Sequence, residues 1–551
     1  MKVFNSVSDL QAASLTAGQL TQTKRYFAGQ DGGGATYLIK TAVDYAGTPD
    51  GYVDHTLANT NVAVLQHSGT VTSKQVGVIE SASYVFSEAE YNRAALTALL
   101  DDERISYAIL EPTGTNAIYV WGSINCRRSN LTVHHKSGCT VIGRYSDPSE
   151  PAFGQAGHLF GFVDYTSVYP NAWNSTIQSE LENIHYILDG KLSTEYNASH
   201  SDLHNNNCLG FANVKNCSVT GEGGIEESDH NGIAFDLDCT NCKVDLNYIR
   251  NCDSQAVKLN APSASTDSTG IVKVREITGL SFDGSADGGA ILVRYQQKAT
   301  VEVGICEQPV SVSKTFVNSQ NNESVEVSVG LVTNAAAIVS FSDTNKIIVK
   351  NSKADNATYG ISRGASSTAA FDSAIMENVT IDTAQNFSVY FSGNNTTSFN
   401  NLQVVNCDFS AVTGTCTPIG NYASGGAPSQ AYFRNNTTPA TWVYRSTIRN
   451  QLDYNLPYTA VGGSSFSYDF AGTNGDFPYR YADIYISIGT TRYMIKWDFT
   501  KHTFTSSTQA ETFDNGTGVT TLTGVRTGTS VAFTISGSGV TPTIAAYALS
   551  N

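Results

Sequence analysis

Long apolar runs and clusters of basic residues are both missing from this chain. No stretch approaches the roughly 18 apolar residues of a membrane-spanning helix, and the first ten residues lack the apolar core of a secretory signal. Lysine and arginine number only 33 against 49 acidic residues, and they are scattered. The sequence therefore lacks the clustered basic residues that a surface needs to bind nucleic-acid phosphates. We expect no nucleic-acid binding, no membrane insertion and no export by the general pathway.

Charged residues are scarce at 15%, and so are methionine (3) and proline (13), whereas glycine (47) and tyrosine (28) are abundant. This composition is typical of β-rich proteins with many turns, and it is poor in helix formers. The formal net charge of −16 is spread thinly and predicts a surface that resists self-association.

The ten cysteines show no paired spacing of the kind that marks a disulfide framework. Several of them adjoin strand-like segments, so we expect reduced, buried thiols. Cys239 and Cys242 have the spacing of a zinc-binding pair, but no second Cys/His pair stands at the required distance. The sequence therefore predicts neither a metal site nor a cofactor.

Short apolar runs return at intervals of about 20–30 residues from residue 183 to 410, a period that is typical of solenoids. Ile184–Leu188, Ile233–Leu237 and Val257–Leu259 are examples, and asparagines such as Asn251 and Asn351 stand between the runs. One strand-and-turn unit per repeat, with asparagine at the corners, indicates a parallel β-solenoid whose rungs stack about 4.8 Å apart.

At 551 residues the chain is too long for one ordinary core, and three domains are expected. Residues 1–80 form a small β-rich head, and residues 81–425 form the solenoid. A helix at 88–100, with Ser87 and Glu90 as a capping box, covers the entrance of the solenoid. Residues 426–551 carry alternating strands such as Tyr481–Ile488 and predict a β-sandwich.

Three groups of segments resemble bacteriophage tailspikes with polysaccharide depolymerase activity. Residues 29–37 and 47–59 look like the tailspike head motif. The helix at 88–100 with Glu111–Gly114 is similar to the entry cap of the pectate-lyase-like β-helix superfamily, and residues 188–190 and 231–236 look like its body. The resemblance covers most of residues 15–410.

The resemblance implies an all-β chain that forms a homotrimer of right-handed parallel β-helices. Such a protein is assembled in the host cytoplasm and attached by its N-terminal region to the virion tail, the baseplate or another tailspike. It binds, and usually cleaves, a bacterial surface polysaccharide such as an O-antigen or a capsule. The family offers no fixed catalytic motif, so the candidate residues come from this sequence.

The segment 233–238 alternates apolar and polar residues with the period of a β-strand. Ile233, Phe235 and Leu237 would face inward, whereas Asp236 and Asp238 would share the open face. Glycosidic hydrolysis needs a proton donor and a second carboxylate on one surface. This pair is therefore the first candidate for the catalytic acids.

Glu226, Glu227 and His230 lie in the segment leading into the same rung, and the two glutamates are further catalytic candidates. Like charges this close raise the pKa of one acid, which produces a proton donor. One rung along, Lys258 and Asn260 would point outward and bind sugar hydroxyls or lower the pKa of a neighbouring acid. His230 is placed with them among the substrate-binding residues.

A second candidate group surrounds Asp189, which lies on an earlier rung near an aromatic stretch that includes Trp173 and Tyr186. Aromatic faces can stack on sugar rings. The same aromatics would equally well seal an irregular excursion of the solenoid. Ser-His-Asp hydrolysis through His200 or His204 lacks the Gly-x-Ser-x-Gly elbow.

A polysaccharide lyase is the alternative chemistry. It would abstract a proton beside a uronate carboxylate and hold that carboxylate with cations, for which Lys258, Arg275 and Arg294 are placed outward on successive rungs. The concentration of acids at 226–238 favours a glycoside hydrolase over the lyase. A receptor-binding spike without catalysis is the third possibility.

Overall fold

A computed structural model describes the chain as two compact units, residues 1–312 and 313–551, which are considered separately. The described residues are 1–29, 32–112, 116–144, 158–164, 179–194, 207–263, 266–281, 289–308, 314–363, 371–382, 387–391, 399–411, 417–420, 428–434, 436–437, 451–454, 465–469, 481–488, 491–498, 506–514, 519–527, 530–536 and 543–549.

A five-stranded sheet forms the head at the start of the chain, with the strand order β1-β2-β3-β5-β4. Tyr37 and Ile39 alternate with half-buried neighbours along β3 and form part of the core of the head. The elements are β1 (Lys2–Phe4), α1 (Val7–Gln11), β2 (Leu20–Thr23), β3 (Thr36–Lys40), α2 (Ala42–Tyr45), β4 (His55–Thr56) and β5 (Val62–Gln66).

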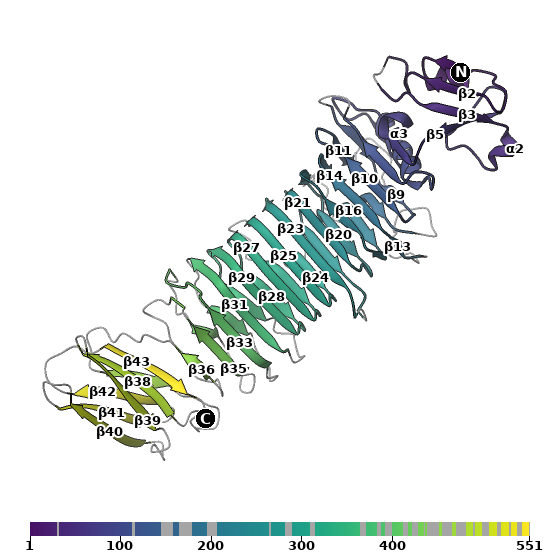
Figure 1. Ribbon diagram of the computed structural model, residues 1–551. Coiled ribbons are helices and arrows are strands. Elements are labelled where there is room, and N and C mark those ends of the chain that lie inside the picture. Colours follow the sequence, from purple (N-terminus) through teal and green to yellow (C-terminus); the bar gives the residue numbers. More distant parts are fainter. Residues whose placement is uncertain are drawn as a thin grey trace. The chain divides into compact units, whose positions relative to one another are not determined.

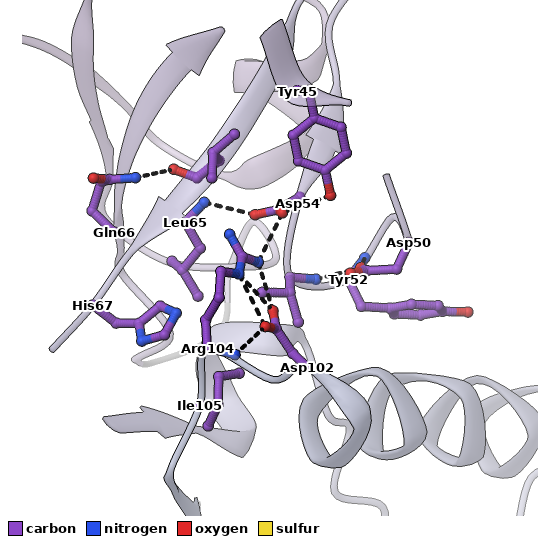
Figure 2. Close-up of polar contacts among 12 residues, drawn as sticks. Tyr45, Asp50, Tyr52, Asp54, Leu65, Gln66, His67, Asp102, Arg104 and Ile105 are labelled. Atoms are coloured by element: carbon purple, nitrogen blue, oxygen red, sulfur yellow. Dashed lines mark hydrogen bonds and ion pairs between the residues drawn. The ribbon is translucent and has the colours of Figure 1, made fainter. Parts of the chain in front are cut away.

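Asp54 joins this sheet to the residues that follow helix α3 (Phe86–Asp101) (Figure 2). Its side chain is fully buried and accepts hydrogen bonds from the Leu65 N–H and the Tyr45 hydroxyl, both at 2.8 Å. Arg104 Nη2 lies 2.8 Å from the same carboxylate, and Arg104 also pairs with Asp102. The charge of this buried acid is therefore compensated by three donors from separate segments.

Replacing Asp54 with Asn should weaken this contact. The new amide places an N–H group where an oxygen accepted from a donor, and a lost hydrogen bond to a charged group costs about 2 kcal/mol. We expect the free energy of opening at the Leu65 amide, measured by hydrogen exchange, to fall by about that amount. The control is Asp44→Asn in exposed α2, which should change nothing; equal protection of Leu65 in both variants would contradict the role of Asp54.

Helix α3 confirms the predicted entry helix but starts differently. The N-cap residue is Val85, and no side chain caps the helix, so the Ser87–Glu90 capping box is not formed. Within the helix, the side chain of Asn92 is buried. It hydrogen-bonds the N–H and C=O of Ile79 and the C=O of Tyr119.

The predicted parallel β-helix is confirmed, and Figure 1 shows the strands between residues 107 and 307 stacked rung upon rung. One large parallel sheet contains β6 (Thr70–Thr72), β7 (Tyr107–Leu110), β8 (Ile118–Trp121), β10 (Leu131–His135), β11 (Thr140–Arg144), β14 (Ile184–Leu188), β15 (Lys191–Thr194), β18 (Ser218–Thr220), β19 (Gly224–Glu227), β21 (Cys242–Arg250), β23 (Thr269–Thr278) and β25 (Lys298–Glu307). This set of strands is called the long sheet.

A second parallel sheet, called the site sheet, contains β9 (Ile124–Cys126), β12 (His158–Phe162), β16 (Asn207–Ala212), β20 (Ile233–Asp236), β22 (Val257–Asn260) and β24 (Gly289–Arg294). A 3-10 turn, η1 (Ser73–Val76), follows β6, and a two-stranded sheet pairs β13 (Leu181–Glu182) with β17 (Val214–Lys215). Strand β6 precedes the domain boundary predicted at residue 80, yet it already pairs in parallel with β7.

Equivalent positions of successive rungs touch, as the solenoid prediction requires. Phe162, Phe211 and Phe235 form a buried stack with ring centroids 4.7 and 4.4 Å apart. At the corners, asparagines adopt left-handed conformations and form ladders. Asn183 donates to Asn130 at 3.0 Å, for example. Asparagine suits these corners because its short side chain tolerates positive φ and bonds the next rung.

In residues 313–551, one sheet contains β27 (Ser324–Thr333), β29 (Lys346–Asp355), β31 (Ser373–Asp382), β33 (Phe399–Val405), β35 (Pro428–Arg434) and β36 (Gln451–Tyr454). A second contains β26 (Thr315–Gln320), β28 (Ala337–Ser342), β30 (Tyr359–Arg363), β32 (Phe387–Phe391) and β34 (Thr417–Gly420). Strand β35 follows the boundary predicted at residue 425 and pairs in parallel with β33.

Two antiparallel sheets follow, as a C-terminal β-sandwich requires. The first contains β37 (Ser465–Asp469), β40 (Ser506–Asp514), β41 (Val519–Thr527) and β42 (Ser530–Ser536). The second contains β38 (Tyr481–Ile488), β39 (Thr491–Asp498) and β43 (Thr543–Leu549).

The nine cysteines within the described ranges are free and buried, as predicted. Among the helices of those ranges, none has the length and apolar character needed to cross a membrane.

Candidate functional site

The two predicted catalytic acids, Asp236 and Asp238, do not lie on the same strand, because a turn begins directly after Asp236. Strand β20 ends at Asp236, and Leu237 and Asp238 then adopt left-handed conformations with φ of 51° and 65°. The expectation that Asp238 shares a strand face with Asp236 is therefore wrong. Asp236 is half-buried on the site sheet, whereas Asp238 is exposed in the turn.

Hydrogen bonds to neighbouring residues hold this turn. The Leu237 N–H donates to Asp236 Oδ1 at 3.0 Å, and the Cys239 thiol lies 3.0 Å from the Asp236 carbonyl oxygen. The Asn213 N–H of the preceding rung donates to the Leu237 carbonyl oxygen at 2.6 Å. Period-two alternation could not reveal these contacts, because they come from the Asp236 side chain and from the rung before.

Lys258 and Asn260 meet Asp236 as the sequence predicts. Strand β22 pairs in parallel with β20, which places both side chains one rung along. Lys258 Nζ lies 2.6 Å from Asp236 Oδ2, and Asn260 Nδ2 donates to Asp236 Oδ1 at 3.0 Å. The side chains of Lys258 and Asp236 are only 18% and 21% exposed, so water screens this ion pair less than a surface pair.

The pKa of Asp236 is set by two opposed effects. Burial alone raises the pKa of this carboxyl group, but the charge of Lys258 and the hydrogen bonds from Lys258 and Asn260 outweigh burial and hold the pKa below its usual 3.8. Asp236 is therefore a carboxylate at neutral pH. It can accept a proton or attack carbon, but it is not the proton donor that the like-charge argument predicts.

A polar network that the sequence did not reveal lies at the beginning of strands β12, β16 and β20. Asn207 Nδ2 lies 2.9 Å from His158 Nδ1, and Asn207 Oδ1 accepts from the Asn231 N–H at 2.9 Å. His230 Nδ1 lies 2.7 Å from Asn231 Nδ2 and 3.3 Å from Asn207 Oδ1. The predicted binding residue His230 is therefore held by two asparagines.

The His158 ring lies against Gly210, where an added Cβ would come within 2.2 Å of the ring. Burial lowers the pKa of His158 to about 3, and the nearby charge of Asp236 opposes that shift only in part. His158 is therefore neutral at pH 7. No local motif marks it, because its partners come from later rungs.

Arg294 of β24 lies one rung beyond Asn260 of β22 in the site sheet, and the two residues are paired in register. The Arg294 side chain is half-buried. Arg275 belongs to strand β23 of the long sheet and forms an exposed pair with Glu222 at 3.6 Å. Arg275 points outward as predicted, but it does so from the long sheet, because β23 lies between β22 and β24 in sequence and not in the site sheet. Arg275 is therefore not on a rung of the sheet that carries Lys258 and Arg294.

Glu226 and Glu227 end strand β19 of the long sheet, where a β-bulge interrupts the register. Glu226 lies 3.6 Å from Lys191, and Glu227 accepts from Ser193 at 3.4 Å. The turn at 228–232 and the whole of β20 separate them from Asp236. Since the three residue steps along β20 span about 10 Å, the glutamates are placed near the opposite end of that strand from Asp236.

Asp189 follows β14 of the long sheet. The carboxylate accepts from the Glu222 N–H at 3.0 Å and lies 3.0 Å from His134 Nε2. Tyr186 is fully buried against Phe160, so the prediction that it could stack on a sugar is wrong. Trp173, His200 and His204 lie outside the described residues.

Within the described part of the chain, no group of three or more His, Cys, Asp or Glu side chains is arranged to hold a metal ion. Cys239 and Cys242 are both buried and free.

No protein-family model matches the chain, and no curated protein matches it in sequence. Among solved structures it is similar to the tailspike of Acinetobacter baumannii phage AM24, with 9% identity, a TM-score of 0.45 and coverage of 100% of this chain and 94% of that one. The tailspike of Acinetobacter phage vB_ApiP_P1 has 12% identity, a TM-score of 0.40 and coverage of 99% of both chains.

A tailspike mutant of Escherichia coli phage HK620, solved with a hexasaccharide, is 12% identical with a TM-score of 0.40; the match covers 89% of this chain and 95% of that one. These similar structures are phage tailspikes.

Proposed function

We propose that this protein is a phage tailspike that binds and depolymerises a bacterial surface polysaccharide on the outward face of strands β20, β22 and β24. The observation that carries the proposal is the ionised carboxylate of Asp236, held by Lys258 and Asn260 on the face of a parallel β-helix. The tailspike-like segments at residues 29–37 and 47–59 support the biological setting.

The reaction that suits this site is glycosidic hydrolysis. Asp236 acts as the base that activates water or as the nucleophile that attacks the anomeric carbon, because its carboxyl group is already ionised. Asp238, exposed in the turn and off the strand face of Asp236, is the candidate nearest to Asp236 in sequence for donating the proton to the leaving oxygen. Asn260 and Arg294 bind sugar hydroxyls or an acidic substituent in the adjacent rung. Glu226 and Glu227 are alternative donors from the neighbouring sheet.

The direct test is incubation of the full chain with purified host polysaccharides, following both reducing ends and the ultraviolet band of unsaturated uronates. Reducing ends that disappear in Asp236→Asn, with no change in that band, are the result expected for hydrolysis at Asp236. If Asp236→Asn abolishes both the reducing ends and the ultraviolet band, the reaction at this site is an elimination. That result would contradict hydrolysis.

A receptor-binding spike without catalysis is the second candidate, and one observation favours it. Both oxygens of Asp236 already have partners in Lys258, Asn260 and the Leu237 N–H, as in a purely structural ion pair. A polysaccharide that binds the chain without any release of reducing ends would select this candidate.

Lys258 should set the acidic limit of activity. Replacing Lys258 with Met removes the charge that lowers the pKa of Asp236 and leaves burial, which raises it. Since Asp236 must be ionised to react, we expect the acidic limb of the pH profile of kcat/KM to move to higher pH. The matched control is Lys243→Met, which removes the partner of Asp245 on the long sheet. An unmoved limb in Lys258→Met would contradict the role of this ion pair.

The remaining parts of the proposal concern assembly. The chain forms a homotrimer, and its N-terminal region attaches it to the virion tail, the baseplate or another tailspike. Sedimentation equilibrium should give three times the 58.9 kDa chain mass, and a monomer at micromolar concentration would contradict the trimer.

A further inference from the structure

Three side chains on the outer surface of the long sheet are hydrogen-bonded in series. The Tyr107 hydroxyl of β7 lies 3.0 Å from His134 Nδ1 of β10, and His134 Nε2 lies 3.0 Å from Asp189 Oδ2 beyond β14. His134 and Asp189 are 23% and 30% exposed, and Tyr107 is half-buried, so the series is open to solvent.

The direction of the hydrogen bonds follows from Asp189. Burial raises the pKa of this carboxyl group, but the hydrogen bonds from the Glu222 N–H and from His134 outweigh burial and hold the pKa below its usual value. Asp189 is therefore an ionised acceptor, and His134 Nε2 must donate to it. In the neutral imidazole this leaves Nδ1 as the acceptor for the Tyr107 O–H.

A hydroxyl that donates to an imidazole, itself held by a carboxylate, is the arrangement that activates a hydroxyl oxygen. The register of the rungs fixes it here. Tyr107 pairs with Thr132 in β10, and His134 pairs with Ile187 in β14, so the three polar side chains lean diagonally across adjacent rungs.

We propose that Tyr107, His134 and Asp189 form a second proton-transfer centre, in which the Tyr107 oxygen is the reacting atom and the substrate is a uronate-containing glycan. This inference rests on the proposed polysaccharide substrate but not on Asp236, which lies on the site sheet. Lys136 and Lys191 stand two residues after His134 and Asp189 in sequence, and each is about 40% exposed. They pair with Glu111 at 3.0 Å and with Glu226 at 3.6 Å, and a uronate carboxylate would replace these glutamates as their partner.

The reaction is a β-elimination that consumes no water. His134 Nδ1 takes the Tyr107 proton, and the Tyr107 oxygen removes the proton from the carbon next to the uronate carboxylate. The released electron pair forms a C=C bond as the glycosidic C–O bond at the next carbon breaks. The leaving oxygen takes a proton from Tyr107, and the tyrosyl oxygen regains its own from His134. One C–O bond is lost and one C=C bond is gained.

The activation of Tyr107 can be tested without a substrate, using benzenesulfonyl fluoride on the full chain. The Tyr107 oxygen attacks sulfur, fluoride leaves, and His134 accepts the proton. We expect Tyr107 to be labelled about 100-fold faster than half-buried Tyr119 on the neighbouring strand β8, the scale of a positioned base. Peptide mass spectrometry measures both rates. Equal rates at the two tyrosines would overturn the proposal.

Variants separate this centre from Asp236. His134→Gln should reduce Tyr107 labelling to the Tyr119 rate, whereas Asp236→Asn should leave the labelling unchanged. Fast labelling that survives His134→Gln would overturn the imidazole as the base.

On a uronate glycan that the chain cleaves, an ultraviolet band that survives Asp236→Asn and disappears in Tyr107→Phe is the expected result. Reducing ends without the band from such a glycan would overturn the elimination while leaving hydrolysis at Asp236 intact.

Discussion

Asp236→Asn is expected to lower the turnover of the cleaved polysaccharide at least about 100-fold, the scale of a lost acid/base group. The amide of Asn can neither accept a proton nor attack the anomeric carbon. It still fills the same volume beside Lys258 and can still accept a hydrogen bond from Asn260, so the fold should be preserved. The measurement is the initial rate of reducing-end release at saturating substrate, less the rate at which unsaturated ends form.

The matched control is Asp245→Asn, which changes another outward aspartate that pairs with a lysine, Lys243, at 2.9 Å. Asp245 lies on the long sheet, so its loss should leave turnover unchanged. Turnover near the unmodified rate in Asp236→Asn would remove Asp236 from the catalytic machinery. Glu226, Glu227 and Asp238 would then be the acids to replace next.

Phe211→Ala should give the largest loss of stability. The ring of Phe211 is fully buried between Phe162 and Phe235, with centroids at 4.7 and 4.4 Å. Truncation removes the contacts on both sides and leaves a cavity inside the rung, which costs about 4 kcal/mol. Hydrogen exchange of the amides in β16 and β20 should show a fall in opening free energy of that size.

Phe211→Leu is the control, since a substitution that nearly keeps the volume costs about 1 kcal/mol. If both variants lower the protection of β16 equally, the cavity account of the stack is wrong. Because β20 carries Asp236, we also expect Phe211→Ala to reduce turnover, with Phe211→Leu retaining most of it.

The β-helix could be predicted because its determinants are local. Alternation within short strands places Phe235 and Leu259 inside, and asparagine at the corners meets the demand for positive φ. The ion pair between Asp236 and Lys258 could also be predicted, because the interval between two adjacent runs gives the rung spacing directly.

The remainder of the site depends on contacts that no local pattern encodes. Asp238 lies outside the strand because the backbone of Leu237 is hydrogen-bonded to the Asp236 side chain and to the Asn213 N–H of the preceding rung. Glu227 ends a strand of a different sheet, although only a short turn separates it from β20. His158 joins residues of later rungs across intervals of about 50 residues, and alternation within one rung says nothing of such partners.

The location of bound sugar tests the central claim most directly. A crystal structure of the full chain with an oligosaccharide fragment of its polysaccharide should show an anomeric carbon on the outward face of β20 and β22, either within about 3.5 Å of an Asp236 oxygen or joined to that oxygen through one bound water. Sugar bound far from Asp236, with Asp236 still paired to Lys258, would contradict the account.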